Sequence, residues 1–177
     1  MGLYLQTAIV LNCKKNKVIE AVKKAESIPY AQVEAEDCQF KEINNGVIIL
    51  FNDYCHGFKP LVKELSIELK QPVMLLYIDD GDYWGYYFYE NGIKFDSFSP
   101  WPDYYEEISG ERRKELAGQS KIISKYFNIK EEKFIKYLVT WELGGLKTKA
   151  YENDEFKYGD CWQMVDFMRE IGYPFSF

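Results

Sequence analysis

Cys55 and His56 are the two residues of this sequence whose types come closest to a catalytic pair. They are adjacent in the segment 52–60, which precedes a stretch with helical spacing, and His56 is the single histidine. A thiol near the start of a helix has a lowered pKa and becomes a nucleophile, and a histidine can serve as its base. Adjacent side chains seldom point at each other, however, and no oxyanion motif is visible. The alternative interpretation is a loop histidine beside a partly buried cysteine.

Three aspartates, Asp79, Asp80 and Asp82, crowd one predicted turn around Gly81. Calcium and magnesium prefer oxygen ligands at such a density. The spacing differs from that of a calcium-binding loop, however, and Asp and Gly are also the residues that tight turns prefer. We therefore predict no metal site and no cofactor.

Asp96, together with Asp82 or Asp103, has the residue type of the paired carboxylates in glycoside hydrolases, and the Tyr and Trp residues nearby would suit sugar stacking. Nothing in the spacing requires this chemistry. A hydrogen bond from Tyr87 to Asp96 across a pair of strands explains Asp96 more simply.

The stretch 72–105 gathers aromatic rings and carboxylates on one predicted ribbon. Tyr and Trp are enriched at protein interfaces, and acidic residues around them favour a basic partner. We expect a partner-binding surface formed by Asp79, Asp80, Asp82, Tyr87, Asp96, Trp101 and Asp103. The alternative is that half of the rings are core and that the rest cover a sheet.

Composition and charge restrict the class of protein. A chain of 177 residues predicts a single domain, and 18% aromatic residues are typical of an ordered globular protein. The net charge of -6 argues against nucleic acid as a partner, because phosphate binding needs clustered Lys and Arg. The four cysteines show no zinc spacing, no apolar run is long enough to span a membrane, and the N-terminus has no basic leader. We therefore expect a cytoplasmic protein without membrane contact, whose oligomeric state is open.

The predicted fold class is α+β. The elements over residues 3–78 follow the order β-α-β-β-α-β, which is the order of a ferredoxin-like fold. Two hairpins follow, with turns at Asp80-Gly81 and Asn91-Gly92, and they extend the sheet to the expected strand order 2-3-1-4-5-6. Residues 1–100 thus form a sheet with two helices. Residues 101–177 form a mainly helical cap, with helices expected over 110–117, 121–127, 130–139 and 161–171, two of them capped by Ser120 and Asp160.

The second hairpin has a predicted register. If Asn91-Gly92 is a two-residue loop, Phe88 faces Phe95 and Tyr87 faces Asp96. One face of the ribbon then carries hydroxyls and a carboxylate that we expect to be reachable by water or by a partner. Its members are Tyr83, Tyr87, Tyr89, Lys94 and Asp96.

The run WGYYFYENGIKFDSFSP at residues 84–100, followed by PDYY at residues 102–105, is similar to a motif of small uncharacterised bacterial proteins. In those proteins the motif is followed by segments like GQSKIISKYFNIKEEKFIKYL and GDCWQMVDFMREIGYP, so the resemblance covers residues from about 45 to 177. Proteins of this kind are often suspected immunity proteins of bacterial toxin systems, which bind a toxin and neutralise it without catalysis. The resemblance implies a binding function and carries over no functional residue.

Three functions follow as alternatives. The first is a soluble non-enzymatic protein-binding domain of the immunity type. The second is a small hydrolase or transferase that uses Cys55 and His56 or the carboxylates of the hairpin. The third is a structural or regulatory domain with a small-molecule pocket.

Substitution of Cys55 separates the first two functions. Cys55→Ser removes the nucleophile, so a binding protein is expected to keep its affinity for its partner, while an enzyme that uses this thiol loses its turnover. Isothermal titration of the variant with the partner measures the outcome. Loss of all activity in this variant would contradict the binding function.

Overall fold

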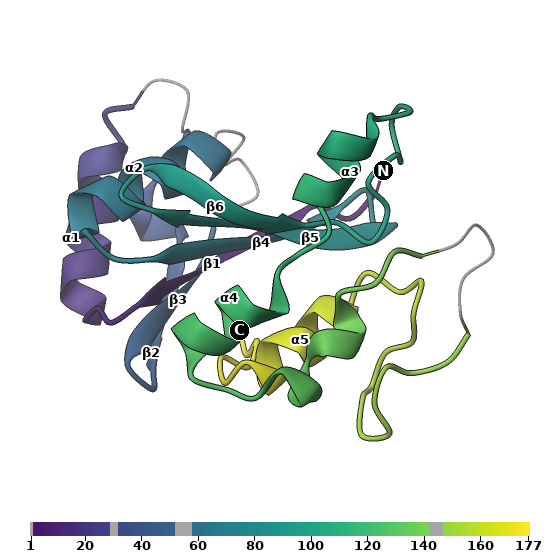
Figure 1. Ribbon diagram of the computed structural model, residues 1–177. Helices are drawn as coiled ribbons and strands as arrows, with labels where there is room; N and C mark the ends of the chain where they lie inside the picture. Colours follow the sequence, from purple (N-terminus) through teal and green to yellow (C-terminus); the bar gives the residue numbers. More distant parts are fainter. Residues whose placement is uncertain (1, 29–31, 52–57, 142–146) are drawn as a thin grey trace. The chain divides into compact units, whose positions relative to one another are not determined.

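The computed structural model describes residues 2–28, 32–51, 58–141 and 147–177 (Figure 1). The strands are β1 (Leu5–Leu11), β2 (Gln39–Ile43), β3 (Gly46–Leu50), β4 (Val73–Asp79), β5 (Tyr83–Glu90) and β6 (Ile93–Phe98). The α-helices are α1 (Lys15–Ala25), α2 (Phe58–Leu69), α3 (Gly110–Glu115), α4 (Ser120–Phe127) and α5 (Gln163–Glu170). Three short 3-10 helices are η1 (Ala35–Asp37), η2 (Glu131–Lys133) and η3 (Ile135–Tyr137).

The six strands form one sheet in the order β2-β3-β1-β4-β5-β6. β1 and β2 both pair with β3 in antiparallel orientation, with Ile9 opposite Ile48 and Lys41 opposite Ile48. The tight turns after β4 and after β5 make those neighbouring pairs antiparallel as well. The expected α+β class is confirmed. β1, β3 and β4 are buried along almost their whole length, which explains the long apolar runs in β3 and β4.

Both hairpin turns are formed by the residue pairs that the sequence predicts. Asp80 and Gly81 have φ angles of 53° and 78°, and Asn91 and Gly92 have φ angles of 50° and 77°. Two successive residues with positive φ are the mark of a type I′ turn, whose twist matches that of the flanking strands. Aspartate and asparagine tolerate this conformation in the first position, and glycine adopts it freely in the second.

The side-chain contacts between β5 and β6 differ from the expected ones at Asp96. Phe88 and Phe95 are in ring contact, with centroids 4.6 Å apart, as expected for facing residues. Asp96, however, accepts a hydrogen bond from the hydroxyl of Tyr86 at 2.8 Å. Tyr86 and Phe88 share one face of β5 because they are two residues apart. Phe95 and Asp96, which are adjacent, thus both contact side chains of this face, and the expected hydrogen bond from Tyr87 to Asp96 is wrong.

The chain is divided into two compact units by its internal contacts. Unit 1 comprises Met1–Leu3, Ile78–Tyr86 and Asp96–Ser176, and unit 2 comprises Tyr4–Tyr77, Tyr87–Phe95 and Phe177. β1, β2 and β3 lie in unit 2 with α1 and α2, whereas α3, α4 and α5 lie in unit 1. The division crosses β4, β5 and β6, so that each of these strands contributes residues to both units.

In unit 2, α1 and α2 lie side by side (Figure 1). Each helix buries one face whose members recur at a spacing of three or four residues, as in an amphipathic helix. These buried residues are Val18, Ala21, Val22 and Ala25 in α1 and Leu61, Val62, Leu65 and Ser66 in α2. Two buried hydroxyls of unit 2 donate hydrogen bonds to backbone carbonyls. Thr7 of β1 donates to Ile49 at 2.7 Å, and Ser66 of α2 donates to Lys63 at 2.7 Å.

The core of unit 1 is built around the ring of Phe167 in α5. This ring lies 5.1 Å from the ring of Trp84 and is stacked on Tyr86 at 6.0 Å, measured between centroids. Phe134 and Tyr137 meet it from the chain around η3, at 6.4 Å and 5.9 Å. One aromatic side chain thus joins β5, the chain around η3 and α5.

The C-terminal part contains fewer helical residues than expected. Segment 130–139, expected as a helix, forms η2 and η3, and residues 139–141 and 147–162 contain no α-helix. The rings of Phe134 and Tyr137 in this segment are buried. The expected cap Ser120 is instead the first residue of α4, and its hydroxyl donates to Glu131. Asp160 accepts a hydrogen bond from the N–H of Trp162 at 2.9 Å, just before α5.

Glu42 of β2 supplies the negative charge at the start of α1. Its carboxylate accepts hydrogen bonds from the N–H of Lys15 at 2.9 Å and from Nζ of Lys14 at 3.0 Å. The bond from the backbone of Lys15, followed by that from Lys14, lowers the pKa of Glu42. An anion in this place complements the helix dipole and fills the role of a missing cap side chain.

We predict that Glu42→Gln lowers the melting temperature at neutral pH, because the charged cap of α1 is lost. A carboxyl whose folded pKa is lowered stabilises the fold above its unfolded pKa, and this contribution is lost as the pH falls through the folded pKa. The difference in melting temperature between wild type and variant should therefore shrink to zero in acid, as followed by circular dichroism over a pH series. Glu36→Gln, which removes an exposed carboxylate of η1, is the control. A difference that persists in strong acid would contradict the capping role.

Candidate protein-binding site

Five side chains of unit 1 form what we call the tyrosine–aspartate cluster: Asp79, Asp82, Tyr83, Tyr104 and Tyr105. The two aspartates flank the type I′ turn between β4 and β5, which is closed by a hydrogen bond from the N–H of Asp82 to the carbonyl of Asp79 at 3.0 Å. Tyr83 is the first residue of β5. The other two tyrosines come from the segment that follows β6.

Tyrosine hydroxyls orient both carboxylates of the cluster. Asp79 accepts hydrogen bonds from Tyr83 at 2.9 Å and from Tyr105 at 3.1 Å, one on each oxygen. Asp82 accepts one from Tyr104. Phenols are neutral donors, so they fix the direction of the carboxylates without cancelling their charge.

The ring of Tyr104 lies at the centre of the aromatic part of the cluster. It meets Trp101 at 5.0 Å and 80°, Tyr105 at 4.8 Å and 88°, and Tyr83 at 5.1 Å and 47°. Edge-to-face contacts of this kind are the favoured geometry of aromatic pairs. A turn with Pro102 in its second position sets them up, since the N–H of Tyr104 donates to the carbonyl of Trp101 at 3.2 Å.

Two pKa shifts follow from these contacts. The hydrogen bond to Asp82, and then burial and the charges of Asp82 and Asp80, raise the pKa of Tyr104 well above its usual value. Asp103 is exposed and pairs with Arg113 at 3.1 Å between Oδ2 and Nη2, and this bond lowers the pKa of Asp103. The phenol of Tyr104 therefore remains a donor, and Asp103 remains charged, throughout the neutral pH range.

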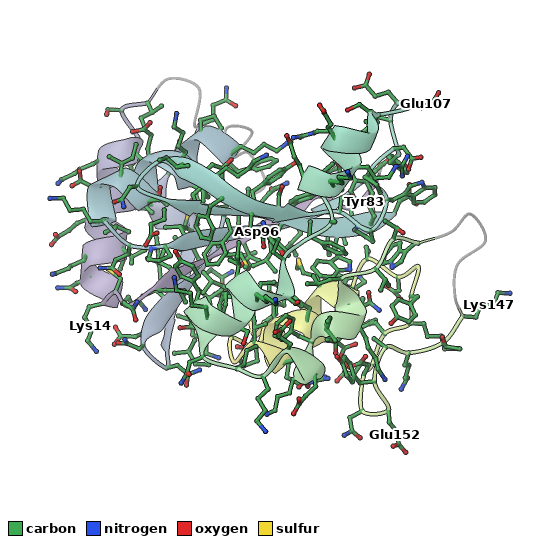
Figure 2. The ribbon with its side chains drawn as sticks, viewed as in Figure 1. Lys14, Tyr83, Asp96, Glu107, Lys147 and Glu152 are labelled. Carbon is green, nitrogen blue, oxygen red and sulfur yellow. The ribbon has the colours of Figure 1, made fainter. Side chains whose placement is uncertain are left out.

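The net charge of the chain lies in unit 1. By sequence this unit has 18 acidic and 12 basic residues, whereas unit 2 has 10 of each. Six acidic residues fall in two short segments, 79–82 and 103–107, that contain no basic residue: Asp79, Asp80, Asp82, Asp103, Glu106 and Glu107. Together with the tyrosine–aspartate cluster and Trp101 we call them the acidic tyrosine surface. Its exposed members include Tyr105, which is 69% exposed, and Glu107, whose side chain points away from the fold in Figure 2.

Asp96 is a buried residue of unit 1 and lies apart from this surface. Asp96, labelled in Figure 2, is only 4% exposed. Its carboxylate accepts one hydrogen bond from the hydroxyl of Tyr86 and another, at 3.3 Å, from the N–H of Gln119 at the start of α4. Burial raises the pKa of Asp96, and the hydrogen bonds from Tyr86 and Gln119 oppose this shift in part. These contacts give Asp96 a structural role, as the link between β6 and α4.

Tyr87 is also largely buried, at 9% exposure, and its ring stacks on Tyr77 within unit 2 at 5.4 Å. Tyr83 and Tyr89 are 6% and 9% exposed. The expectation that this face of the hairpin is open to water is therefore wrong. Of the predicted site residues, Asp79, Asp80, Asp82, Trp101 and Asp103 lie close together in the fold of unit 1, and their role in binding stays a prediction.

The other chemistries considered from the sequence have no geometry to support them. Cys55 and His56 lie outside the described residues, so that the catalytic alternative stays a prediction. The three carboxylates proposed as a glycosidase pair each have a separate partner: Tyr104 for Asp82, Tyr86 for Asp96 and Arg113 for Asp103. Across the described ranges, no group of three or more His, Cys, Asp or Glu side chains is arranged to hold a metal ion.

A second group of charged side chains in unit 1 is internal. The carboxylates of Asp154 and Asp166 are fully buried and contact Arg169 at 3.1 Å and 2.6 Å. Asp166 also accepts the N–H of Glu155 at 3.0 Å, and the hydroxyl of Tyr137 donates to Asp154. These bonds fasten the segment around residue 155 to α5, so the group has a structural role.

A scan against protein-family models, a search of curated proteins and a search of solved structures each found no match. No helix in the part of the chain that the structure describes is long and apolar enough to cross a membrane. The case for the acidic tyrosine surface therefore rests on its own geometry and charge.

Sequence reasoning missed three of the residues that organise this surface: Tyr83, Tyr104 and Arg113. Tyr83 was expected on the open face of the second hairpin, and it instead donates to Asp79 beside the first turn. Tyr104 and Arg113 meet Asp82 and Asp103 across 22 and 10 residues of chain. The one signal available was the Pro-Asp-Tyr-Tyr segment itself, because tyrosines that directly follow a proline turn are held in a defined direction.

We predict that Asp82→Asn returns the pKa of Tyr104 toward the ordinary tyrosine value of 10.0, because the negative charge beside the phenol is removed. Ring-carbon NMR shifts followed over a pH series measure this pKa, with the resonance assigned through Tyr104→Phe. Asp103→Asn is the matched control, since its carboxylate pairs with Arg113 and should leave the titration of Tyr104 unchanged. An identical pKa of Tyr104 in wild type and Asp82→Asn would refute the contact.

Proposed function

We propose that this protein is a non-enzymatic binding domain whose acidic tyrosine surface docks a basic segment of another protein. The observation that carries this proposal is the concentration of six carboxylates and exposed aromatic surface in two segments that contain no basic residue, although one of the six, Asp103, pairs with Arg113. Elsewhere in unit 1 the acidic and basic residues balance, at 12 of each. Such a local field attracts a positively charged partner and speeds its approach.

The preorganisation of the carboxylates supports binding. Asp79 and Asp82 are already held by tyrosine hydroxyls, so little side-chain entropy is lost when they meet a partner. Tyr105, with two thirds of its surface exposed, offers a ring on which a lysine or arginine side chain can lie. Rings beside charges are also the residue types that contribute most to protein interfaces.

We further propose a ferredoxin-like beginning of the fold, a specific role as a toxin inhibitor and a cytoplasmic location. The element order and the strand order support a ferredoxin-like beginning that two hairpins extend, with α3, α4 and α5 as a partial cap. The resemblance of residues 84–105 to suspected immunity proteins supports an inhibitor of a basic toxin as the specific role. Cys13 and Cys161 are free thiols, which fits a cytoplasmic location. A hydrolase or transferase that uses Cys55 and His56 is the alternative.

Neutralising the acidic turn tests the proposal. Asp79→Asn, Asp80→Asn and Asp82→Asn are combined in one variant, because each change keeps a hydrogen-bond acceptor for the tyrosines while it removes the charge. A partner is captured from lysate of the source cells and identified, and its affinity for both proteins is measured by isothermal titration. We expect a partner with a basic contact segment, a loss of affinity of about tenfold or more, and weaker binding as salt is raised.

The matched control removes the same number of charges from unit 2, by Glu20→Gln, Glu34→Gln and Glu36→Gln, which are exposed positions. This control should bind like wild type. Equal affinity of the wild type and the Asp79/Asp80/Asp82 variant for the captured partner would overturn the proposal, as would binding that salt leaves unchanged.

A further inference from the structure

Four buried side-chain atoms of the described residues have no hydrogen-bond partner in the protein: Nε1 of Trp84, Nε1 of Trp141, and both Nε2 and Oε1 of Gln163. All three residues belong to unit 1, and Gln163 and Trp84 are completely buried. Buried polar groups are almost always paired, with protein or with water, because leaving them unpaired costs stability. An amide with both ends unpaired inside a core therefore requires a ligand.

Gln163 lies close to Trp84 because of their places on α5 and β5. Phe167 contacts the ring of Trp84 at 5.1 Å. Gln163 precedes Phe167 by four residues, so the two side chains lie on the same face of α5, one turn apart. The amide of Gln163 is thus directed into the packing between α5 and β5.

The direction of α5 places its first turn toward the beginning of β5. Burial, and then the charges of Asp160 and Asp82, raise the pKa of Cys161 to about 11, which puts Cys161 within the electrostatic reach of Asp82. Asp82 precedes Trp84 by two residues. The chain before Gln163 therefore runs toward the Trp84 end of β5.

Trp141 is linked to the same end of the unit through the chain that follows β6. The backbone N–H of Trp141 donates to the carbonyl of Pro100 at 2.7 Å. Pro100 follows Phe98 by two residues, and the ring of Phe98 contacts Trp84 at 5.2 Å. The backbone of Trp141 and the ring of Trp84 are thus both in contact with the chain at residues 98–100.

We propose that Gln163, Trp84 and Trp141 line an internal hydration site in unit 1, where ordered water joins α5 to β5. The three side chains present four N–H donors and one carbonyl oxygen, so the ligand must chiefly accept hydrogen bonds and must also donate one. Water does both and carries no charge. A buried water of this kind makes about three hydrogen bonds and is an integral part of the fold. The site is independent of the proposed partner-binding surface.

A high-resolution crystal structure of the full chain tests the site directly. We expect water oxygen within about 2.7–3.2 Å of the Gln163 amide and of at least one of the two indole nitrogens. In solution, the same water gives exchange or Overhauser cross-peaks to the indole N–H protons. A dry site, or an amide of Gln163 that pairs directly with protein groups, would overturn the proposal.

Gln163→Met supplies a second measurement, because methionine fills a similar volume and makes no comparable hydrogen bonds. We expect this variant to lose the water cross-peaks and to melt roughly 2–8 °C below wild type, since the water loses its main partner and the indoles stay unpaired. Gln39→Met, the same change at an exposed position of β2, should leave both readouts unchanged. A Gln163→Met variant as stable as wild type, or more stable, would contradict the hydration site.

Discussion

The contact of Phe167 with Trp84 and Tyr86 is the interaction on which the structure of unit 1 depends. It fixes α5 against β5, and through Phe134 and Tyr137 it also fixes the 3-10 segment. β5 begins at Tyr83, so the same packing holds the first hairpin turn in place. The direction of the carboxylates at that turn therefore depends on the buried ring of Phe167, which lies some 85 residues further along the chain.

Unit 1 uses aspartate and tyrosine in two chemically different ways. Inside, Asp154 and Asp166 are both paired with Arg169, which offsets part of their negative charge, and every contact serves the fold. At the turn before β5, Asp79 and Asp82 are held by tyrosines alone, which leaves their charge available. The difference decides which carboxylates can act on a partner, and it is invisible in composition, because both groups contain the same residue types.

The parts of the fold that depend on local sequence were predictable. Asp80-Gly81 and Asn91-Gly92 specify their turns, and the uninterrupted apolar runs specify the buried strands. The partner of Asp96 was not, since Asp96 meets Tyr86 and not Tyr87, and no sequence pattern marks this contact. The helix expected over residues 130–139 was wrong: the segment forms η2 and η3, and its spacing of buried rings suits an α-helix and a 3-10 helix equally. The partners of Asp82 and Asp103 come from remote positions, which single-sequence patterns do not connect.

Because the division between the two units crosses three strands, each unit is assembled from three separate pieces of chain. No single break in the backbone releases either unit intact, and a fragment cut at one place lacks part of at least one unit. Genetic recombination, which exchanges contiguous stretches, cannot transplant the acidic unit into another protein without carrying strands of its neighbour along. The two units are thus bound to be inherited, expressed and degraded together.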